Sequence, residues 1–445
     1  MPILRTAIAI LFLTLSFSDN AAAQAEPELG IDKTTSGIVR QIKAKKRSQD
    51  YVRKRGWVQG ENTKKDGGLF FVAIGVGTNT MTPTDPGWVG GRTFAFDEAL
   101  LRAKAKLAEY IGTEISTSLK RDYERNMGKA PGKNKADPTN SAPSIPDDSI
   151  GKMKLLLKAK LDQALAKEGI KPDSPEAPKA VGRLLREKSM EKAVESVAKA
   201  RVSGVQVAKI FESKGEGKKG QIAVIAMQSD KLKRMADAIA SGNYSSIPPG
   251  KAKKPLWDQV PTDPEILSTS FGVQQTRDEN GRYVLISYGQ SFPFIPDDED
   301  ELEMAIDSAQ LEAQAGIRSF AGENVSVLNS SNKSTSLQTL TENMDSRQFN
   351  QQDKKSIEAV AESLNISGMR NLMDEEMEHP FTGKQMVVSV VTWSPEGGMS
   401  ARSLGEKMEE PTSENSGSGD SRQWGKADYG DGYQAEGADV DEDDF

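Results

Sequence analysis

The run Leu-Phe-Phe-Val-Ala-Ile-Gly at residues 69–75 and the run Tyr-Val-Leu-Ile-Ser-Tyr-Gly at residues 283–289 decide the fold of this 445-residue chain. Each run is short and apolar, ends in glycine, and follows a polar turn that contains an Asp-Gly or Asn-Gly pair. Such a pair before an apolar run is typical of a β-hairpin whose second strand is buried. The sequence therefore predicts two hairpins of the same design.

A helix is expected after each hairpin, and its small and apolar residues recur without a gap at residues 103–115 and 313–325. Alanine and glycine at helical spacing let a helix pack closely onto a sheet. Tyr110 and Phe320 take equivalent positions in this match, so we expect both in the core.

Two further blocks complete each copy. Residues 202–205 (Val-Ser-Gly-Val) match residues 366–369 (Ile-Ser-Gly-Met), and the apolar strand at 221–227 matches 385–391 at the same offset. Strands, a helix across one face and strands again make an α+β layer. We predict the fold class α+β, with two repeated modules, each a small antiparallel sheet with helices packed on one face.

Between its helix and the Val-Ser-Gly-Val run at 202–205, the first copy has about 50 more residues than the second copy has in the equivalent place. This insertion falls at about 127–188 and opens with a stretch rich in Pro, Gly, Lys and Asn, which predicts an extended or disordered loop. Leu155, Leu156, Leu161 and Leu165 then predict an amphipathic helix. The first module is therefore expected to carry a helical insertion.

The chain is thus expected to contain six segments. Its last 37 residues hold twelve acidic and two basic side chains, a balance of −10 in a chain whose net charge is −7, so this tail is predicted to be disordered. The predicted segments are a signal peptide (1–25), a basic helical segment (26–56), the first module (57–245), a Pro-rich linker (246–266), the second module (267–408) and the acidic tail (409–445).

The N-terminus has the pattern of a secretory signal. Arg5 precedes an uninterrupted apolar run at residues 7–17, and Ala23-Gln24-Ala25 forms a small-x-small cleavage site. The run is too short to span a ~30 Å hydrocarbon layer, and no later segment is apolar enough. The chain has no cysteine, which excludes disulfides and thiolate metal sites. We expect a periplasmic protein without a transmembrane segment after signal removal; secretion is the alternative.

No motif predicts chemistry, and we expect no enzyme activity and no catalytic, cofactor-binding or metal-binding residue. The only histidine, His379, lies in a predicted exposed turn and cannot build a multi-histidine zinc site. The glycines at 75 and 77 follow a strand, but Thr80 replaces the third glycine of a dinucleotide motif. The acidic run at 297–301 lacks the central glycine of a calcium loop and is expected to cap a helix.

Trp88 is the one candidate for a ligand contact. It lies in the polar stretch 82–88, which is expected to be a loop after the first buried strand. An exposed indole ring there is suited to stacking on a sugar. Nucleic acid is not an expected partner, because no basic stripe interleaved with aromatic residues is present.

The strand that ends in Gly75-Val76-Gly77, the alanine-rich helix at 103–107 and the run at 202–205 resemble a small bacterial envelope domain. That domain occurs in a family of outer-membrane lipoproteins and is similar to the N-terminal part of flagellar assembly protein T. The resemblance covers about residues 57–227 and 271–393, so the domain is present twice. It implies a non-enzymatic envelope protein that acts in outer-membrane or appendage assembly. The chain departs from it by lacking the lipoprotein cysteine, and by its insertion and acidic tail.

These features favour a non-enzymatic periplasmic scaffold or adaptor of the bacterial cell envelope. Two related modules offer two related surfaces to an envelope protein partner. The basic helices at 37–55 and in the insertion offer a salt-sensitive contact to an anionic envelope polymer. The alternative is a module that binds an envelope glycan or another ligand, and a carboxylate-dependent hydrolase is the third hypothesis.

Overall fold

The computed structural model describes both predicted modules. The described residues are 31–33, 39–41, 44–126, 149–215, 218–244, 247–322, 366–400 and 434–440. The strands β1 (Ile31–Lys33) and β2 (Val39–Gln41) pair in a two-stranded sheet of their own. The predicted signal peptide and the opening of the insertion at 127–148 lie outside the described residues.

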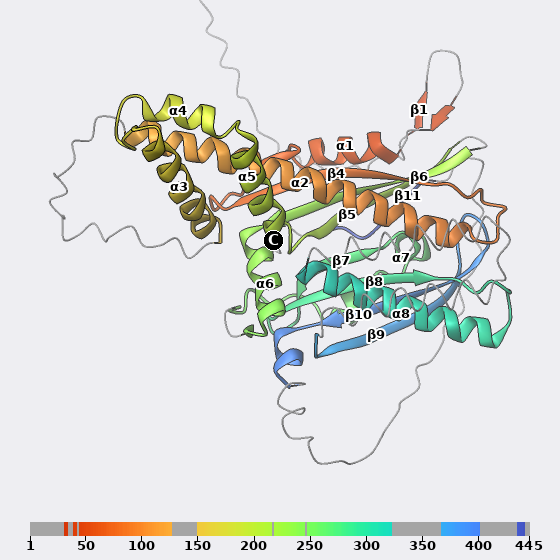
Figure 1. Ribbon diagram of the computed structural model, residues 1–445. Coiled ribbons are helices and arrows are strands. Elements are labelled where there is room, and N and C mark those ends of the chain that lie inside the picture. The colour runs from red at the N-terminus through yellow and green to blue at the C-terminus, as the bar shows by residue number, and fades with distance from the viewer. Residues whose placement is uncertain are drawn as a thin grey trace, which may run out of the picture. The chain divides into compact units, whose positions relative to one another are not determined.

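The first module is built on a five-stranded sheet with the order β11-β5-β6-β4-β3 (Figure 1). All its strand pairs are antiparallel. The hairpin predicted from residues 69–75 is β3-β4, and a second hairpin, β5-β6, pairs with it through β6. The strands are β3 (Gly60–Thr63), β4 (Leu69–Asn79), β5 (Gln206–Gly215), β6 (Lys218–Ser229) and β11 (Gln434–Glu436).

The second module repeats this topology in a four-stranded antiparallel sheet with the order β7-β8-β10-β9. The strands β7, β8, β10 and β9 correspond, in this order, to β3, β4, β6 and β5 of the first sheet. The predicted fold class, α+β with two repeated modules, is confirmed. The strands are β7 (Gly272–Arg277), β8 (Tyr283–Ser291), β9 (Met369–Glu378) and β10 (Gln385–Trp393).

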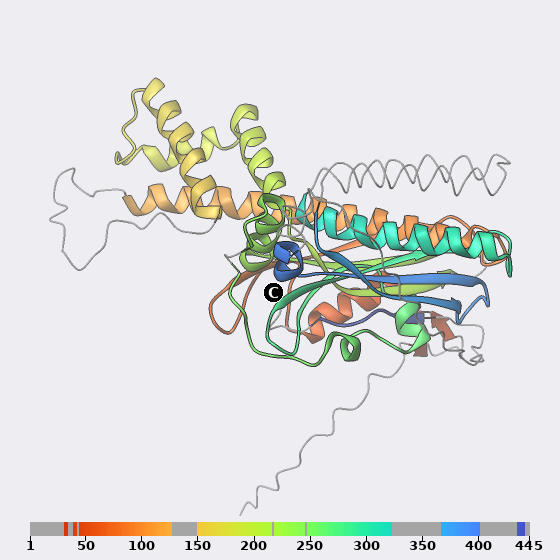
Figure 2. The ribbon, with the colours of Figure 1, turned by 90° about the horizontal axis from the view of Figure 1, so that it is seen from below.

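One long helix packs on each sheet: α2 (Trp88–Asn126) on the first and α8 (Glu299–Ala321) on the second. The two helices run side by side on the same side of their sheets (Figure 2). The acidic run predicted to cap a helix does so, because the Asp298 side chain accepts a hydrogen bond from the backbone N–H of Glu301 at 3.1 Å.

Glycine allows each helix to approach its sheet. A Cβ atom at Gly75 would lie 1.7 Å from the carbonyl oxygen of Ala99, and one at Gly289 would lie 2.1 Å from that of Ala309. Gly77 lies against Ala95 of α2 in the same way, at 1.8 Å. The glycines that end each apolar run are therefore packing positions.

The sequence match between the strands at 221–227 and 385–391 is offset by one residue from their correspondence in the structure. Gly75 pairs with Val224 across the first sheet. Gly289 pairs with Ser389 across the second. Val224 therefore corresponds to Ser389, whereas the sequence match placed it on Val388. The strands β5 and β9 each contain a bulge at the equivalent place, so the extra residue lies in the turn between β9 and β10.

The insertion is helical, as predicted. The helix α2 runs for 39 residues against 23 in α8, and its extra turns pack with α3 (Ser149–Lys167), α4 (Ala177–Leu184) and α5 (Lys188–Arg201) (Figure 1). Leu161 and Leu165 are fully buried in this cluster together with Tyr123 of α2. Leu155 and Leu156, which were expected to support the same apolar face, are exposed.

The helix α1 (Ala44–Lys54) covers the other face of the first sheet. The predicted basic helical segment (26–56) is helical in α1, but the prediction is wrong for residues 31–33 and 39–41, which form β1 and β2. Ala44 and Val52 of α1 pack in the same cluster as Val72 and Ile74 of β4. The helix α6 (Asp230–Ser241) follows β6 and packs against α8 of the second module. None of the helices in the described part of the chain has the length and apolar character of a membrane span.

The segment predicted as a linker packs against the β7–β8 hairpin of the second module, because the backbone N–H of Gly250 donates to the carbonyl oxygen of Gly281 at 2.8 Å. It forms a short 3-10 helix (Leu256–Gln259) and α7 (Pro264–Ser268), and Val260 is buried. The sheets adjoin where β5 meets β7, because the backbone N–H of Gln275 donates to the Gln206 side chain at 3.0 Å. The two modules therefore share a continuous interface.

Candidate functional site

The outer edge of the first sheet holds an extended acidic segment. The strand β11 adds antiparallel to β5, with Gln434 opposite Ser213 and Glu436 opposite Phe211. The prediction that the whole tail is disordered is therefore wrong for residues 434–440; the rest of 409–445 lies outside the described residues. An edge strand offers unpaired backbone groups, and β11 pairs with the part of the β5 edge at residues 211–213.

The helix α1 lines this edge with alternating cations and aromatic rings. The Arg47 guanidinium lies 5.2 Å from the centre of the Phe211 ring. The Arg55 guanidinium lies 5.4 Å from the Tyr51 ring and 5.3 Å from the Trp57 ring. Each cation over a ring face gains a favourable electrostatic contact that also fixes its position. We call α1, the residues Arg55 and Trp57 that follow it, and the β5 edge together the tail-binding edge.

These cations bind the carboxylates of the tail. Arg47, whose side chain is only 7% exposed, forms an ion pair with Glu436, and Lys209 of β5 lies 3.7 Å from the same carboxylate. Arg55 donates to Asp439 and to the carbonyl oxygen of Val440, each at 3.1 Å. Charge-assisted hydrogen bonds of this kind are stronger than neutral ones.

The Tyr51 hydroxyl donates a hydrogen bond to the Asp439 carboxylate and accepts one from Arg55. Burial raises the pKa of the Tyr51 hydroxyl, and the neighbouring Asp439 charge raises it further. The hydroxyl therefore stays protonated and remains a donor to the tail at any physiological pH.

The tail segment also fits by shape. A Cβ atom at Gly437 would lie 2.7 Å from the carbonyl oxygen of Thr269, so the segment needs glycine at this position. Three residues later, Val440 is buried at 5% exposure in the core cluster beneath α1. The order Glu-Gly-Ala-Asp-Val at 436–440 thus supplies two charges, one close approach and one apolar anchor.

Both modules contact the tail. The backbone N–H of Gly437 donates to Ile210 of the first module at 3.1 Å. The Gln274 side chain of β7 donates to the carbonyl oxygen of Ala438 at 3.3 Å, and the Ser270 hydroxyl accepts from the N–H of Ala438 at 3.4 Å. The tail-binding edge therefore lies at the junction of the two modules.

Trp88, the predicted ligand contact, is buried. It begins α2 and is not in a loop, and its ring is only 4% exposed. The Trp88 ring contacts the His379 ring edge-on at 4.7 Å between centroids, and the Arg92 guanidinium lies 5.3 Å from it. The prediction of an exposed contact is wrong because the turn of the second module covers this end of α2.

His379 is likewise buried, although a turn position predicted exposure. Its Nδ1 accepts a hydrogen bond from the backbone N–H of Phe381 at 3.2 Å. Burial lowers the pKa of the imidazole well below its usual value, and the positive charge of Arg92 lowers it further. The histidine is therefore neutral in the folded protein.

Arg92 is the centre of a buried polar cluster that joins the modules. It is fully buried on α2 and forms a forked ion pair with Glu212 of β5, with N···O distances from 2.7 to 3.0 Å. It also donates to Gln290 of β8 at 3.2 Å and to the carbonyl oxygen of Ser268 at 2.7 Å. Sequence patterns did not single out Arg92, because its partners lie in three distant segments.

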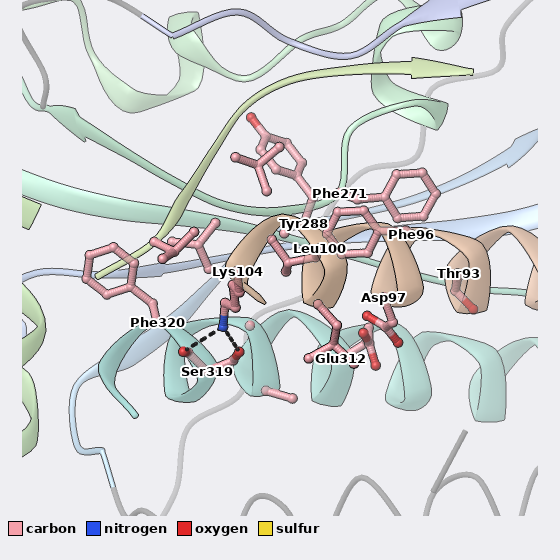
Figure 3. A pocket seen from close by; sticks show the side chains of 17 residues that line it. Thr93, Phe96, Asp97, Leu100, Lys104, Phe271, Tyr288, Glu312, Ser319 and Phe320 are labelled. Carbon is pink, nitrogen blue, oxygen red and sulfur yellow. Dashed lines mark hydrogen bonds between the residues drawn. The ribbon is translucent and has the colours of Figure 1, made fainter. Parts of the chain in front are cut away.

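A small cavity lies between α2 and α8 (Figure 3). Asp97 of α2 and Glu312 of α8 point their carboxylates toward one another there, and Lys104 donates to the Ser319 hydroxyl at 3.2 Å. The cavity volume of about 40 Å³ holds roughly three water molecules. The carboxylate pair therefore has room for water but not for a sugar ring.

Metal binding has no support within the described ranges, where no three His, Asp or Glu side chains are grouped to hold an ion. The sequence contained one signal for the tail-binding edge: a basic helix near one end of the chain and an acidic tail at the other. Opposite charge alone does not say that the two segments meet.

Comparisons with known proteins found a family model and a solved structure. A family model described as "Domain of unknown function (DUF6844)" matches residues 148–241, which run from α3 to α6. A crystal structure of a hypothetical protein from Francisella tularensis is similar, with a TM-score of 0.44 and 17% identity over 82% of this chain and 94% of that one. No curated protein matches the chain.

Proposed function

We propose that the protein is a non-enzymatic periplasmic adaptor of the bacterial cell envelope, and that its tail-binding edge binds an acidic extended segment of an envelope partner. The seating of residues 434–440 on β5 and α1 carries this proposal. Strand addition supplies main-chain hydrogen bonds, and side-chain contacts supply specificity. The chain's own tail then acts as a built-in competitor for the partner.

The proposed location rests on the signal-like pattern at residues 1–25 and on the absence of cysteine. The basic helix was expected to contact an anionic envelope polymer. Its Arg47 and Arg55 instead bind carboxylates of the tail, which favours an acidic peptide as the ligand of α1.

The other two hypotheses have less support. The glycan-binding alternative depended on an exposed Trp88, whose ring is buried. A hydrolase would need space for its substrate beside a carboxylate pair, and the cavity at Asp97 and Glu312 holds only a few waters.

The direct test uses a chain that lacks residues 434–445 and a fluorescent peptide of residues 431–445. We expect saturable binding that weakens between about 50 mM and about 500 mM salt, because Arg47 and Arg55 pair with acidic side chains. A peptide with Glu436→Lys and Asp439→Lys should bind at least about tenfold more weakly. The full-length chain should also bind less peptide, since its own tail occupies the edge.

A peptide of the same composition in scrambled order is the matched control. Equal binding of the scrambled and native peptides would contradict the proposal, because charge alone would then account for the contact. A photo-cross-linker at Lys209 of the tail-deleted chain should capture an envelope protein. Native peptide added before irradiation should prevent this capture, and the scrambled peptide should not.

A further inference from the structure

The helix α3 has an apolar face that points away from the rest of the protein. Leu155 and Leu156 are 50% and 67% exposed, whereas Leu157, Leu161 and Leu165 on the opposite face are at most 1% exposed. Adjacent exposed leucines on a helix that already buries three others are not needed for its packing. They are available for contact with something outside the molecule.

The exposed positions of α3 form one continuous face, since successive residues are separated by 100° around the helix axis. The face carries two leucines, two alanines and one glutamine, with lysines at its margin. These positions are Leu155, Leu156, Ala159, Lys160, Gln163, Ala166 and Lys167. We call this surface the α3 face.

The charges of α3 are sorted around this face. Its one acidic residue, Asp162, is turned toward α2, where it accepts a hydrogen bond from the Tyr123 hydroxyl at 2.6 Å. Lys154 and Lys158 are likewise turned toward α2, since Lys154 donates to Ser118 of α2 at 2.5 Å and Lys158 lies 5.9 Å from the Tyr123 ring centre. The charged residues of the α3 face itself are Lys160 and Lys167.

We propose that the α3 face docks on an anionic lipid surface. An apolar strip that carries Lys160 and Lys167 along one margin fits the boundary between acyl chains and headgroups, where leucines enter the apolar layer and lysine stems extend to the phosphates. The positive charge of these two exposed lysines attracts anionic headgroups. This surface does not involve the tail-binding edge, so the two proposals fail independently.

The test is flotation of the full-length protein with vesicles of phosphatidylethanolamine and phosphatidylglycerol, compared with phosphatidylcholine alone. We expect binding to the anionic vesicles only, and less at high salt. Leu155→Glu with Leu156→Glu should lower the bound fraction at least about tenfold, and Lys160→Glu with Lys167→Glu should lower it to a similar extent. Both pairs are exposed, so circular dichroism should show an unchanged fold.

Val58→Glu is the matched control, because Val58 is a 58% exposed apolar residue outside α3. It should bind the vesicles like the native chain. The proposal is overturned if the native chain does not bind anionic vesicles, or if the leucine variant binds as well as the control. Loss of a protein partner with unchanged vesicle binding in the leucine variant would also overturn it, in favour of a protein groove.

Discussion

The strands β5 and β9 hold the same place in the two sheets but protect their edges by different means. The edge of β5 is covered by β11 and α1, and its Ile210 and Phe211 are buried. The edge strand β9 carries exposed acidic side chains, among them Asp374 and Glu376. Charged edges deter pairing with another chain, and covered edges have no free backbone groups. One module is thus suited to receive an acidic strand, and the other repels one.

The largest expected effect comes from one position shared by both edges. Glu212 pairs with Ile222 and Glu376 pairs with Val387, at equivalent places in the sheets. Glu212→Ala leaves Arg92 buried without its carboxylate, which should lower the free energy of unfolding by about 3–5 kcal/mol. Glu376→Ala removes an exposed side chain and should change it by less than about 0.5 kcal/mol.

Urea denaturation of both variants measures this difference. Similar losses in the free energy of unfolding for Glu212→Ala and Glu376→Ala would mean that the Arg92 cluster does not make the two edges different.

A smaller and symmetric effect is expected where the modules are most alike. Gly75→Ala and Gly289→Ala each place a methyl group inside van der Waals contact with a helix backbone. Both should lower the free energy of unfolding by about 1–3 kcal/mol, the usual range for overpacking. Thermal melts of the two variants provide the measurement.

Gly182→Ala in α4 is the control, since a Cβ atom there would meet only the Lys120 side chain, at 4.0 Å. It should be neutral or stabilising, as alanine is favoured in helices. If Gly75→Ala and Gly289→Ala behaved like this control, the close seating of α2 and α8 on their sheets would be refuted.

The smallest effect concerns the turn that is longer in the second module. His379 has a lowered pKa in the folded protein, so below pH ~6.5 the unfolded state binds a proton that the folded state does not. Stability is therefore fully present above this pH and should fall by up to about 1.4 kcal/mol per pH unit as the pH drops from ~6.5 toward 5.

Because the chain has one histidine, His379→Phe isolates this effect. The native chain and the variant should be compared by urea denaturation at several pH values. Parallel stability curves would show that the histidine is solvated in the folded state.

The sequence predicted the parts of the fold that depend on local pattern. The apolar runs, their closing glycines and the helix at 103–115 were sufficient to find two copies of one module. The last strand was matched one residue out of place because β10 is buried on both faces, so its apolar residues do not alternate and cannot fix the register.

The candidate sites depended on distant contacts that local pattern does not contain. Trp88 has the neighbours of a loop residue in sequence, yet it is covered by a turn that includes His379. The tail is acidic enough to predict a solvated segment, and its order comes from Arg47 and Arg55 near the other end of the chain. Composition describes a segment alone and does not reveal which partner compensates its charge.

The ion pair of Arg47 and Glu436 joins residues that are 389 positions apart. Among the described elements, β11 is the last to be synthesised, so residues 211–213 of β5 lack this strand partner until residues 434–436 have been made. Closing so long a loop is slow compared with forming the hairpins. A chain truncated before Gln434 would leave this part of the β5 edge unpaired and open to pairing with a strand of another chain.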